Sequence, residues 1–325
     1  MDLTEIVKKR NRNYWMGWSI CLIILCHIQY TCYNGKDIMN CMRFLFKKGE
    51  CGVDVFIFLS IVGLSYSIER NSIWSYYRHR IKRIFPMYLL FLFLSYVLFT
   101  PKDNLFRIFF LQLSGMANFT GNTFNEWFIP ALLLIYASFP LFFYGITRLY
   151  RANQFLCVLL IIIVIYSYII TSDFITLFFA RRLYLIILGI VVYLTFKQKS
   201  KLEAIGILSI IAMLQLFIPS DFNMYLYVPL LLVILDSLFN DYPMYRIMNW
   251  LGKHSLEVYL GQTMGIIFYC NQSSLRPLYK LPIGIIITFV SAIILLGGHL
   301  CLQKLTLDVI KYIEKEFLKL GKKNY

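Results

Sequence analysis

The chain has 325 residues, of which 59% are hydrophobic, 18% aromatic and only 15% charged, and its mean hydropathy is +0.66. This composition excludes a disordered chain and an ordinary water-soluble protein, because both need more polar surface. The net charge of +15 does not indicate nucleic-acid binding, since the basic residues stand between apolar runs and form no single basic face. We therefore expect an all-α integral membrane protein.

Ten apolar segments are long enough to cross a bilayer, which takes about 20 residues, or somewhat fewer when the helix ends reach the interface. In chain order they are residues 14–30, 53–68, 85–100, 127–147, 155–171, 183–196, 202–218, 225–239, 255–270 and 281–302. No cleavage site follows the first segment, so we expect it to remain as a helix. Short connectors leave no room for a soluble domain, and residues 1–302 are predicted to form a single polytopic bundle.

The basic residues predict the orientation of this bundle. Ten spans place both termini on the same side, and that side holds 22 Lys and Arg residues against 10 on the other. The richer side faces the cytoplasm by the positive-inside rule. We expect a multi-pass protein of the plasma or inner membrane with both termini in the cytoplasm.

The basic tail, residues 303–325, has apolar residues at helical spacing. They are Leu305, Val309, Ile313 and Phe317, with Lys and Glu between them. This pattern predicts an amphipathic helix along the inner membrane surface, attracted to anionic lipid.

The eight cysteines do not form a metal-binding pattern, and no metal is expected. Half of them stand within apolar segments as small hydrophobic residues. The others, on the expected outer side, are Cys32, Cys41, Cys51 and Cys270. That compartment permits a disulfide, but the sequence does not give its pairing.

Two ionisable residues stand near the expected outer membrane level. His27 lies close to the outer end of the first segment and Asp54 at the outer start of the second. A carboxylate beside an imidazole would fix its tautomer and raise its basicity, as a general base needs. Alternatively, His27 bonds a neighbouring helix and Asp54 stabilises the start of its own helix.

Three further side chains are expected at this outer level. Glu126 and Trp127 open the fourth segment, and Arg182 opens the sixth. An aromatic ring and a guanidinium suit a sugar, because the ring stacks on an apolar sugar face and the Arg donates to oxygen atoms. Trp127 would equally fit an interfacial aromatic belt.

A basic cluster, residues 76–83, precedes the third segment on the expected inner side. Arg80 and Arg83 offer paired donors to phosphate oxygens, so a nucleotide-bearing donor such as coenzyme A would bind there from the cytoplasm. The alternative is a cluster that only sets topology and contacts lipid head groups.

Six different short motifs follow one another along the chain. They are residues 14–20 (YWMGWSI) leading to His27, residues 52–60 (GVDVFIFLS), residues 80–86 (RIKRIFP), residues 127–129 (WFI) with Tyr136 and Pro140, Arg182 with Gly189, and residues 251–260 (LGKHSLEVYL). In this order and with this number of spans, the chain resembles the membrane-bound acyltransferase-3 family, the polytopic O-acyltransferases of cell-surface glycans.

The chain departs from the family pattern at four places. The first-helix arginine of the family falls on Met16, and Arg12, one helical turn earlier, is the nearest substitute. The glycine after Ser60 is displaced to Gly63. The acidic residue of the fourth helix falls on Leu132, and a histidine common after the final motif falls on Gln262.

The resemblance implies transfer of an acyl group, acetyl by expectation, from acyl-coenzyme A to a hydroxyl of an exported or surface polysaccharide or a lipid-linked glycan. His27 would be the general base and Asp54 would orient it. Arg80, Arg83 and Arg12 would bind the donor. The residues that would position the acceptor or the acyl group are Trp127, Arg182, Glu126, Tyr259 and Gln262.

A second class of function also fits a polytopic chain. A carrier or flippase would move a lipid-linked sugar or a small solute along polar residues near the membrane midplane. Inverted repeats with broken helices in two corresponding halves would favour a carrier, and the sequence contains no visible repeat of this kind.

Overall fold

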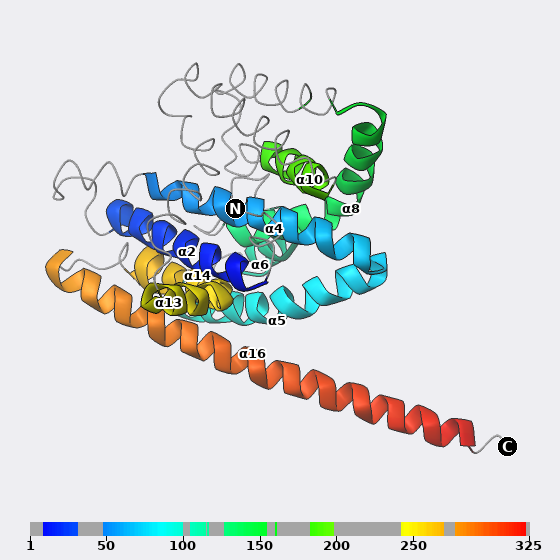
Figure 1. Cartoon of the computed structure of the whole chain (residues 1–325). Coiled ribbons are helices and arrows are strands. Elements are labelled where there is room, and N and C mark those ends of the chain that lie inside the picture. Colours follow the sequence, from blue (N-terminus) through cyan, green and yellow to red (C-terminus); the bar gives the residue numbers. More distant parts are fainter. Residues whose placement is uncertain are drawn as a thin grey trace.

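The computed structural model describes residues 9–31, 48–99, 105–114, 116, 127–154, 160, 183–197, 242–269 and 277–322. Every regular element in these ranges is a helix, which confirms the all-α class for the described part of the chain. The elements are α2 (Lys9–Thr31), η1 (Lys48–Glu50), α4 (Cys51–Arg70), α5 (Ile73–Phe99), α6 (Leu105–Ser114), α8 (Phe128–Ala152), α10 (Leu183–Lys197), α13 (Tyr242–Lys253), α14 (Ser255–Gln262), η5 (Thr263–Tyr269) and α16 (Pro277–Lys322) (Figure 1).

Three described segments are long and apolar enough to cross a membrane: Cys51–Arg70, Phe128–Ala152 and Leu281–Leu302. Helices also cover the expected spans 14–30, 85–100, 183–196 and 255–270 to within a residue at their ends. The expected spans 202–218 and 225–239, and all but one residue of 155–171, lie outside the described residues. The chain is therefore a helical membrane protein, while the number of ten spans stays a prediction.

Helix α2 packs against α4 on one side and α13 on another. Glycines allow the second contact to be close, because Gly17 lies against the backbone of Met248 and Gly252 against the backbone of Asn13. Small residues at a crossing let two helix backbones approach, which adds packing contacts that lipid cannot replace. This crossing positions the N-terminal half of α2.

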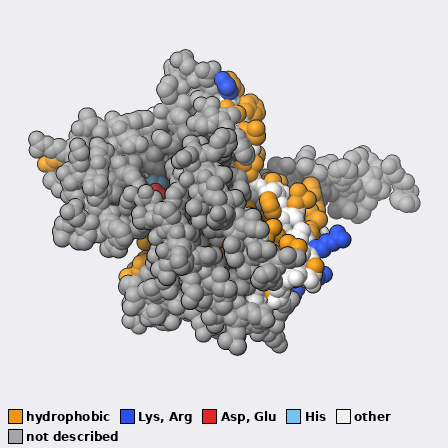
Figure 2. Space-filling model, turned by 90° about the horizontal axis from the view of Figure 1, so that it is seen from above, with side chains coloured by type: hydrophobic (Ala, Val, Ile, Leu, Met, Phe, Trp, Pro, Cys, Tyr) orange, Lys and Arg blue, Asp and Glu red, His pale blue; other side chains and the backbone are white. Residues whose placement is uncertain are grey.

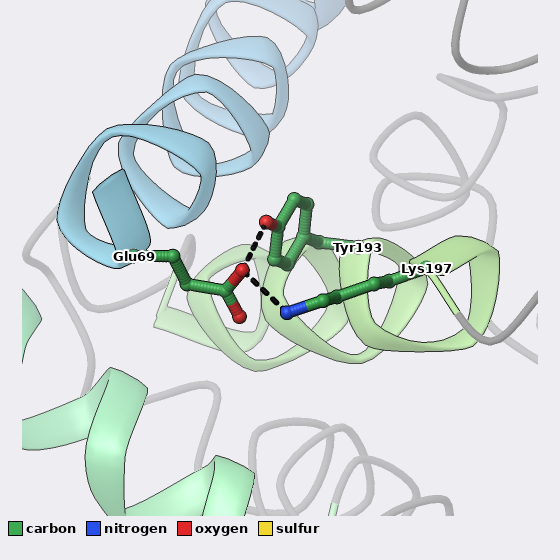
Figure 3. A network of polar contacts seen from close by, with 3 residues as sticks. All are labelled: Glu69, Tyr193 and Lys197. Carbon is green, nitrogen blue, oxygen red and sulfur yellow. Dashed lines mark hydrogen bonds and ion pairs between the residues drawn. The ribbon is translucent and has the colours of Figure 1, made fainter.

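Helix α4 also packs against α10. Gly189 lies against the side chain of Ile61, and at the ends of the two helices three side chains form a network (Figure 3). The Glu69 carboxylate accepts a hydrogen bond from Tyr193 Oη at 2.8 Å and pairs with Lys197 Nζ at 2.6 Å. The pair fixes the end of α10 against the end of α4.

We expect this network to stabilise the protein only modestly, because the Lys197 side chain is 57% exposed and an exposed ion pair contributes at most about 1 kcal/mol. Lys197→Met should lower the thermal unfolding midpoint in detergent slightly, and Glu69→Met should lower it more because both bonds are lost. Lys253→Met, on another exposed lysine, serves as the control. Equal shifts for Glu69→Met and Lys253→Met would contradict this assignment.

Helix α5 docks on α8 through two tyrosines. Tyr76 Oη donates to the Tyr136 carbonyl at 3.1 Å, and Tyr77 Oη donates to the Ala137 carbonyl at 2.8 Å. Burial raises the pKa of Tyr76, so its hydroxyl stays protonated and remains a donor at physiological pH. These bonds hold the basic residues of α5 against the side of α8.

Two helices were not expected from the sequence. Helix α6 lies between the third and fourth expected spans, and Tyr88 Oη donates to Gln112 Oε1 on it at 3.2 Å. Helix α13 lies before the ninth expected span and presents Tyr245 and Met248 to α2. Both are short and amphipathic, which a search for long apolar runs overlooks.

The tail is helical, as predicted, and continues the last span as one helix, α16 (Figure 1). No Gly or Pro stands between His299 and Leu320, so the sequence contains no signal that would end the helix at Leu302. In Figure 1 the C-terminal part of α16 projects away from the bundle without a bend. The placement of the tail along the membrane surface stays a prediction.

On the face seen in Figure 2, hydrophobic side chains form exposed patches among the described residues. Along α16 the exposed ones include Ile286, Phe289 and Ile293, and only 17% of its span is buried. An apolar surface of this kind fits contact with lipid.

Candidate functional site

His27 lies where α2 contacts α14 and η5. His27 lies about one turn before the end of α2, and its Nδ1 atom is 2.8 Å from Gln262 Oε1 at the end of α14. Gln262 is fully buried and stands where the α-helix α14 changes into the π-helical segment η5. Such changes of helix type are frequent at functional sites, because they turn side chains out of the regular register.

The hydrogen bonds around Gln262 fix which ring nitrogen of His27 carries a proton. Thr263 Oγ1 donates its single hydrogen to the Tyr259 carbonyl at 3.1 Å, so toward Gln262 it can only accept. The donor Nε2 of Gln262 faces it at 3.4 Å, which leaves Oε1 of the amide, an acceptor, facing His27. His27 Nδ1 must therefore donate to Gln262, and Nε2 of the neutral ring carries the lone pair.

Asp54 is fully buried in the first turn of α4. The packing of α4 on α2 sets its depth: Gly52 lies against the Ser19 carbonyl and the Ile23 side chain, and His27 lies one turn beyond Ile23. The hydrogen bond described for the His27 ring goes to Gln262. The predicted pairing of Asp54 with His27 stays a prediction.

Aromatic rings join the starts of α4 and α8 to α14. The Phe128 ring packs edge-on against Trp127, Phe56 and Tyr259, with ring centroids 5.9, 5.9 and 5.0 Å away. Tyr259 lies one turn before Gln262, so Trp127 and the His27–Gln262 pair are connected through two ring contacts. Glu126 and Arg182 lie outside the described residues.

Three arginines gather near the opposite end of α2. Arg12 lies two residues before the first expected span; burial lowers the pKa of its guanidinium, and the nearby positive charges of Arg83 and Arg80 lower it further. An arginine stays protonated in spite of such shifts, so the three positive charges share one region. The structure thus brings together the three residues predicted to bind the donor.

Tyrosines hold Arg80 in place. Its Cζ atom lies 5.8 Å from the ring centroids of both Tyr76 and Tyr136, where the ring faces attract a cation. The Nε atoms of Arg12 and Arg80 are buried, and neither has a hydrogen-bond partner within the described residues. Buried guanidinium donors without partners, close to like charges, favour an anionic ligand.

The two groups are separated along α2. Arg12 and His27 are 15 residues apart, which corresponds to about 22 Å of helix. A ligand that used both groups would need a charged head at the arginines and an extended arm toward His27.

Two of the positions that depart from the family pattern are packed. Met16 and Leu132 belong to the main hydrophobic core, with 4% and 3% of their surfaces exposed. Neither position lies where a charged side chain would fit without unpacking the core. Within the described residues, no group of three His, Cys, Asp or Glu side chains is arranged to hold a metal ion.

Sequence reasoning missed one residue of this arrangement. Gly63 on α4 lies directly beside Nη1 of Arg12. Its displacement from the family position was visible in the sequence, but the partner that explains it appears only in the packing.

Comparison with known proteins agrees with these features. The model of the acyltransferase-3 family, an acyltransferase domain, matches residues 13–297. No curated protein and no solved structure matches the chain. The match covers most of α2 through most of the last span, and with it His27, Arg80 and Arg83, and it begins one residue after Arg12. The chain therefore belongs to the acyltransferase-3 family and is a membrane acyltransferase.

Proposed function

We propose that this acyltransferase moves an acetyl group from acetyl-coenzyme A to a hydroxyl of an exported or surface polysaccharide, or of its lipid-linked precursor. The observation that carries the proposal is the hydrogen bond between His27 and Gln262, which leaves a basic nitrogen on a half-buried ring. Family membership supports the acyl transfer, while the acetyl group, the acceptor and the sidedness are our proposal.

The donor would bind through its phosphates at Arg12, Arg80 and Arg83. Coenzyme A carries several phosphate groups and a long thiol-bearing arm, so it matches a cationic cluster separated by about 22 Å from the base. The excess of basic residues on the side of the arginines supports entry of the donor from the cytoplasm.

At the other end His27 Nε2 would take the proton of the acceptor hydroxyl as its oxygen attacks the thioester carbonyl. The C–O bond forms, the C–S bond breaks, and the imidazolium returns its proton to the departing thiolate. Gln262 Oε1 would keep accepting from Nδ1 throughout, which stabilises the positive ring. Trp127 and Arg182 would position the sugar, and Tyr259 would support the base through Gln262.

The test uses the chain in the cell that makes it. His27→Ala should remove acetyl from the surface polysaccharide, measured by mass analysis of the repeat unit, while the amount of polysaccharide exported stays unchanged. Loss of export at unchanged acetyl content would contradict the proposal and support a carrier. His79→Ala, on an exposed histidine of α5, is the matched control.

Gln262 offers a separate prediction. Gln262→Leu removes the acceptor that holds Nδ1–H, so kcat should fall about 10- to 100-fold, the loss expected for one hydrogen bond to a charged group. Gln262→Glu keeps an acceptor and should retain more activity than Gln262→Leu. Purified protein in nanodiscs would be assayed by release of coenzyme A thiol, and equal activity of Gln262→Leu and the unaltered protein would contradict this role.

A further inference from the structure

Arg12 crosses from α2 to α4 at Gly63, where α4 has no side chain. A Cβ atom placed on Gly63 would lie 2.6 Å from Arg12 Nη1 and 3.8 Å from Arg12 Cζ and Cδ. Apart from its chain neighbours and the backbone of α4 itself, the three atoms nearest to that position all belong to Arg12. The space over Gly63 is therefore filled by the guanidinium of Arg12.

The register of the two helices explains why this glycine and this arginine meet. Helices α2 and α4 run antiparallel, because Gly49 lies against Leu22 and Cys26 while Gly63 lies against Arg12. Relative to the family pattern, the arginine is displaced from position 16 to 12 and the glycine from 61 to 63. In antiparallel neighbours, both displacements run toward the same end of the bundle.

Positions 16 and 61, where the family pattern has the arginine and the glycine, are filled by packed apolar side chains in this chain. Ile61 is fully buried and its side chain packs on Gly189 of α10. Met16 is 4% exposed and belongs to the core. A guanidinium at position 16 would have to enter packed apolar surface without a described partner, which is costly.

We propose that Gly63 is a positioning residue for the donor site: it opens the place on α4 in which Arg12 lies, so that Arg12 takes the part of the displaced arginine beside Arg80 and Arg83. The inference rests on the proposed binding of coenzyme A by this cluster. Gly63 itself touches no ligand and acts only through the position of the Arg12 head group.

The contact makes the pairing testable without unfolding the protein. The atom nearest the added Cβ is the far end of a long flexible side chain, which moves more easily than backbone. Gly63→Ala should therefore leave the fold intact and displace the Arg12 head. Most other tight glycines face backbone or packed side chains, where an added methyl group strains the fold.

The experiment measures binding of coenzyme A to the full chain in nanodiscs, together with the thermal unfolding midpoint. We expect Gly63→Ala to raise the Kd for coenzyme A about tenfold, as for loss of a charge-assisted contact, with little change in the midpoint. Gly145→Ala and Gly297→Ala are matched controls, because nothing lies within 4 Å of the Cβ that each adds. Gly189→Ala strains the packing of α4 on α10 and controls for a general disturbance of α4.

A double-mutant cycle decides whether Gly63 acts through Arg12. Arg12→Ala should weaken binding at least as much as Gly63→Ala, and the double variant should bind no worse than Arg12→Ala alone. Additive losses, a loss for Gly189→Ala equal to that of Gly63→Ala, or unchanged binding by Gly63→Ala would each overturn the pairing. Unaltered protein that failed to bind coenzyme A would instead overturn the proposed function and, with it, the ligand assigned to this cluster.

Discussion

Replacement of His27 by Ala should reduce acyl transfer by about 10²- to 10⁴-fold, the usual contribution of a positioned general base. The reason is local: Gln262 accepts from Nδ1, which leaves Nε2 of the neutral ring as the basic nitrogen. The variant should bind coenzyme A normally, since His27 and the arginine cluster lie about 22 Å apart along α2. Purified protein, acetyl-coenzyme A and acceptor polysaccharide would give kcat and KM separately.

The His27 prediction has a demanding control. His27→Gln keeps a polar side chain of similar reach but supplies no base, so it should be as inactive as His27→Ala while its thermal unfolding midpoint stays closer to that of the unaltered protein. Substantial activity in His27→Gln would mean that the ring serves packing or hydrogen bonding and not proton transfer.

Replacement of Arg80 by Gln should raise the KM for acetyl-coenzyme A about 10- to 100-fold with a smaller change in kcat. Arg80 is half-buried between Tyr76 and Tyr136, and its Nε has no partner within the described residues, so its donors are available to an anion. The effect should fall mainly on KM because the phosphates are bound alike in the ground state and in the transition state.

Arg78→Gln is the matched comparison for Arg80→Gln. Arg78 belongs to the same basic run of α5 and carries the same charge, but it is exposed. If the cluster only sets topology or attracts lipid, the two variants should have equal, small effects on KM. A selective effect of Arg80→Gln separates a binding site from a general basic surface.

The sequence singled out the ionisable groups that are costly to place in or beside an apolar segment. His27 stands within an apolar segment, and Arg80 lies just before the third apolar segment. Ionisable side chains are costly at such positions, so each of them indicated a functional role. The structure puts His27 at one end of α2 and brings Arg12, Arg80 and Arg83 together at the other. Charged and titratable groups are rare within apolar segments, so they can be identified from the sequence as candidate functional residues.

The residues that contact these groups could not be predicted from the sequence. Gln262 is 235 positions from His27 along the chain. A neutral amide in an apolar segment does not predict which side chain it will contact. The sequence favoured Asp54 because a carboxylate is the stronger partner, and that pairing stays a prediction beside the bond to Gln262. The role of Gly63 likewise became clear only from the contact that the Arg12 side chain makes with it across the α2–α4 interface.

The order of helices was predicted better than their ends and their smaller neighbours. Long apolar runs gave α4, α8 and the span of α16, because lipid contact requires such runs. Helix α13 escaped notice, since its sequence is mixed and its packing depends on Gly252 lying against α2. Tertiary contact, and not local pattern, decides such elements.

In the proposed reaction, a donor bound at the arginine cluster acylates an acceptor exposed on the other side of the membrane. Sealed membrane vesicles from the native cells test it directly, with radiolabelled acetyl-coenzyme A supplied only to the cytoplasmic face and label measured in the polysaccharide of the opposite face. Label should appear there in vesicles with the unaltered chain and be absent with His27→Ala. Label found only when donor and polysaccharide share one face, or found equally with His27→Ala, would contradict the account.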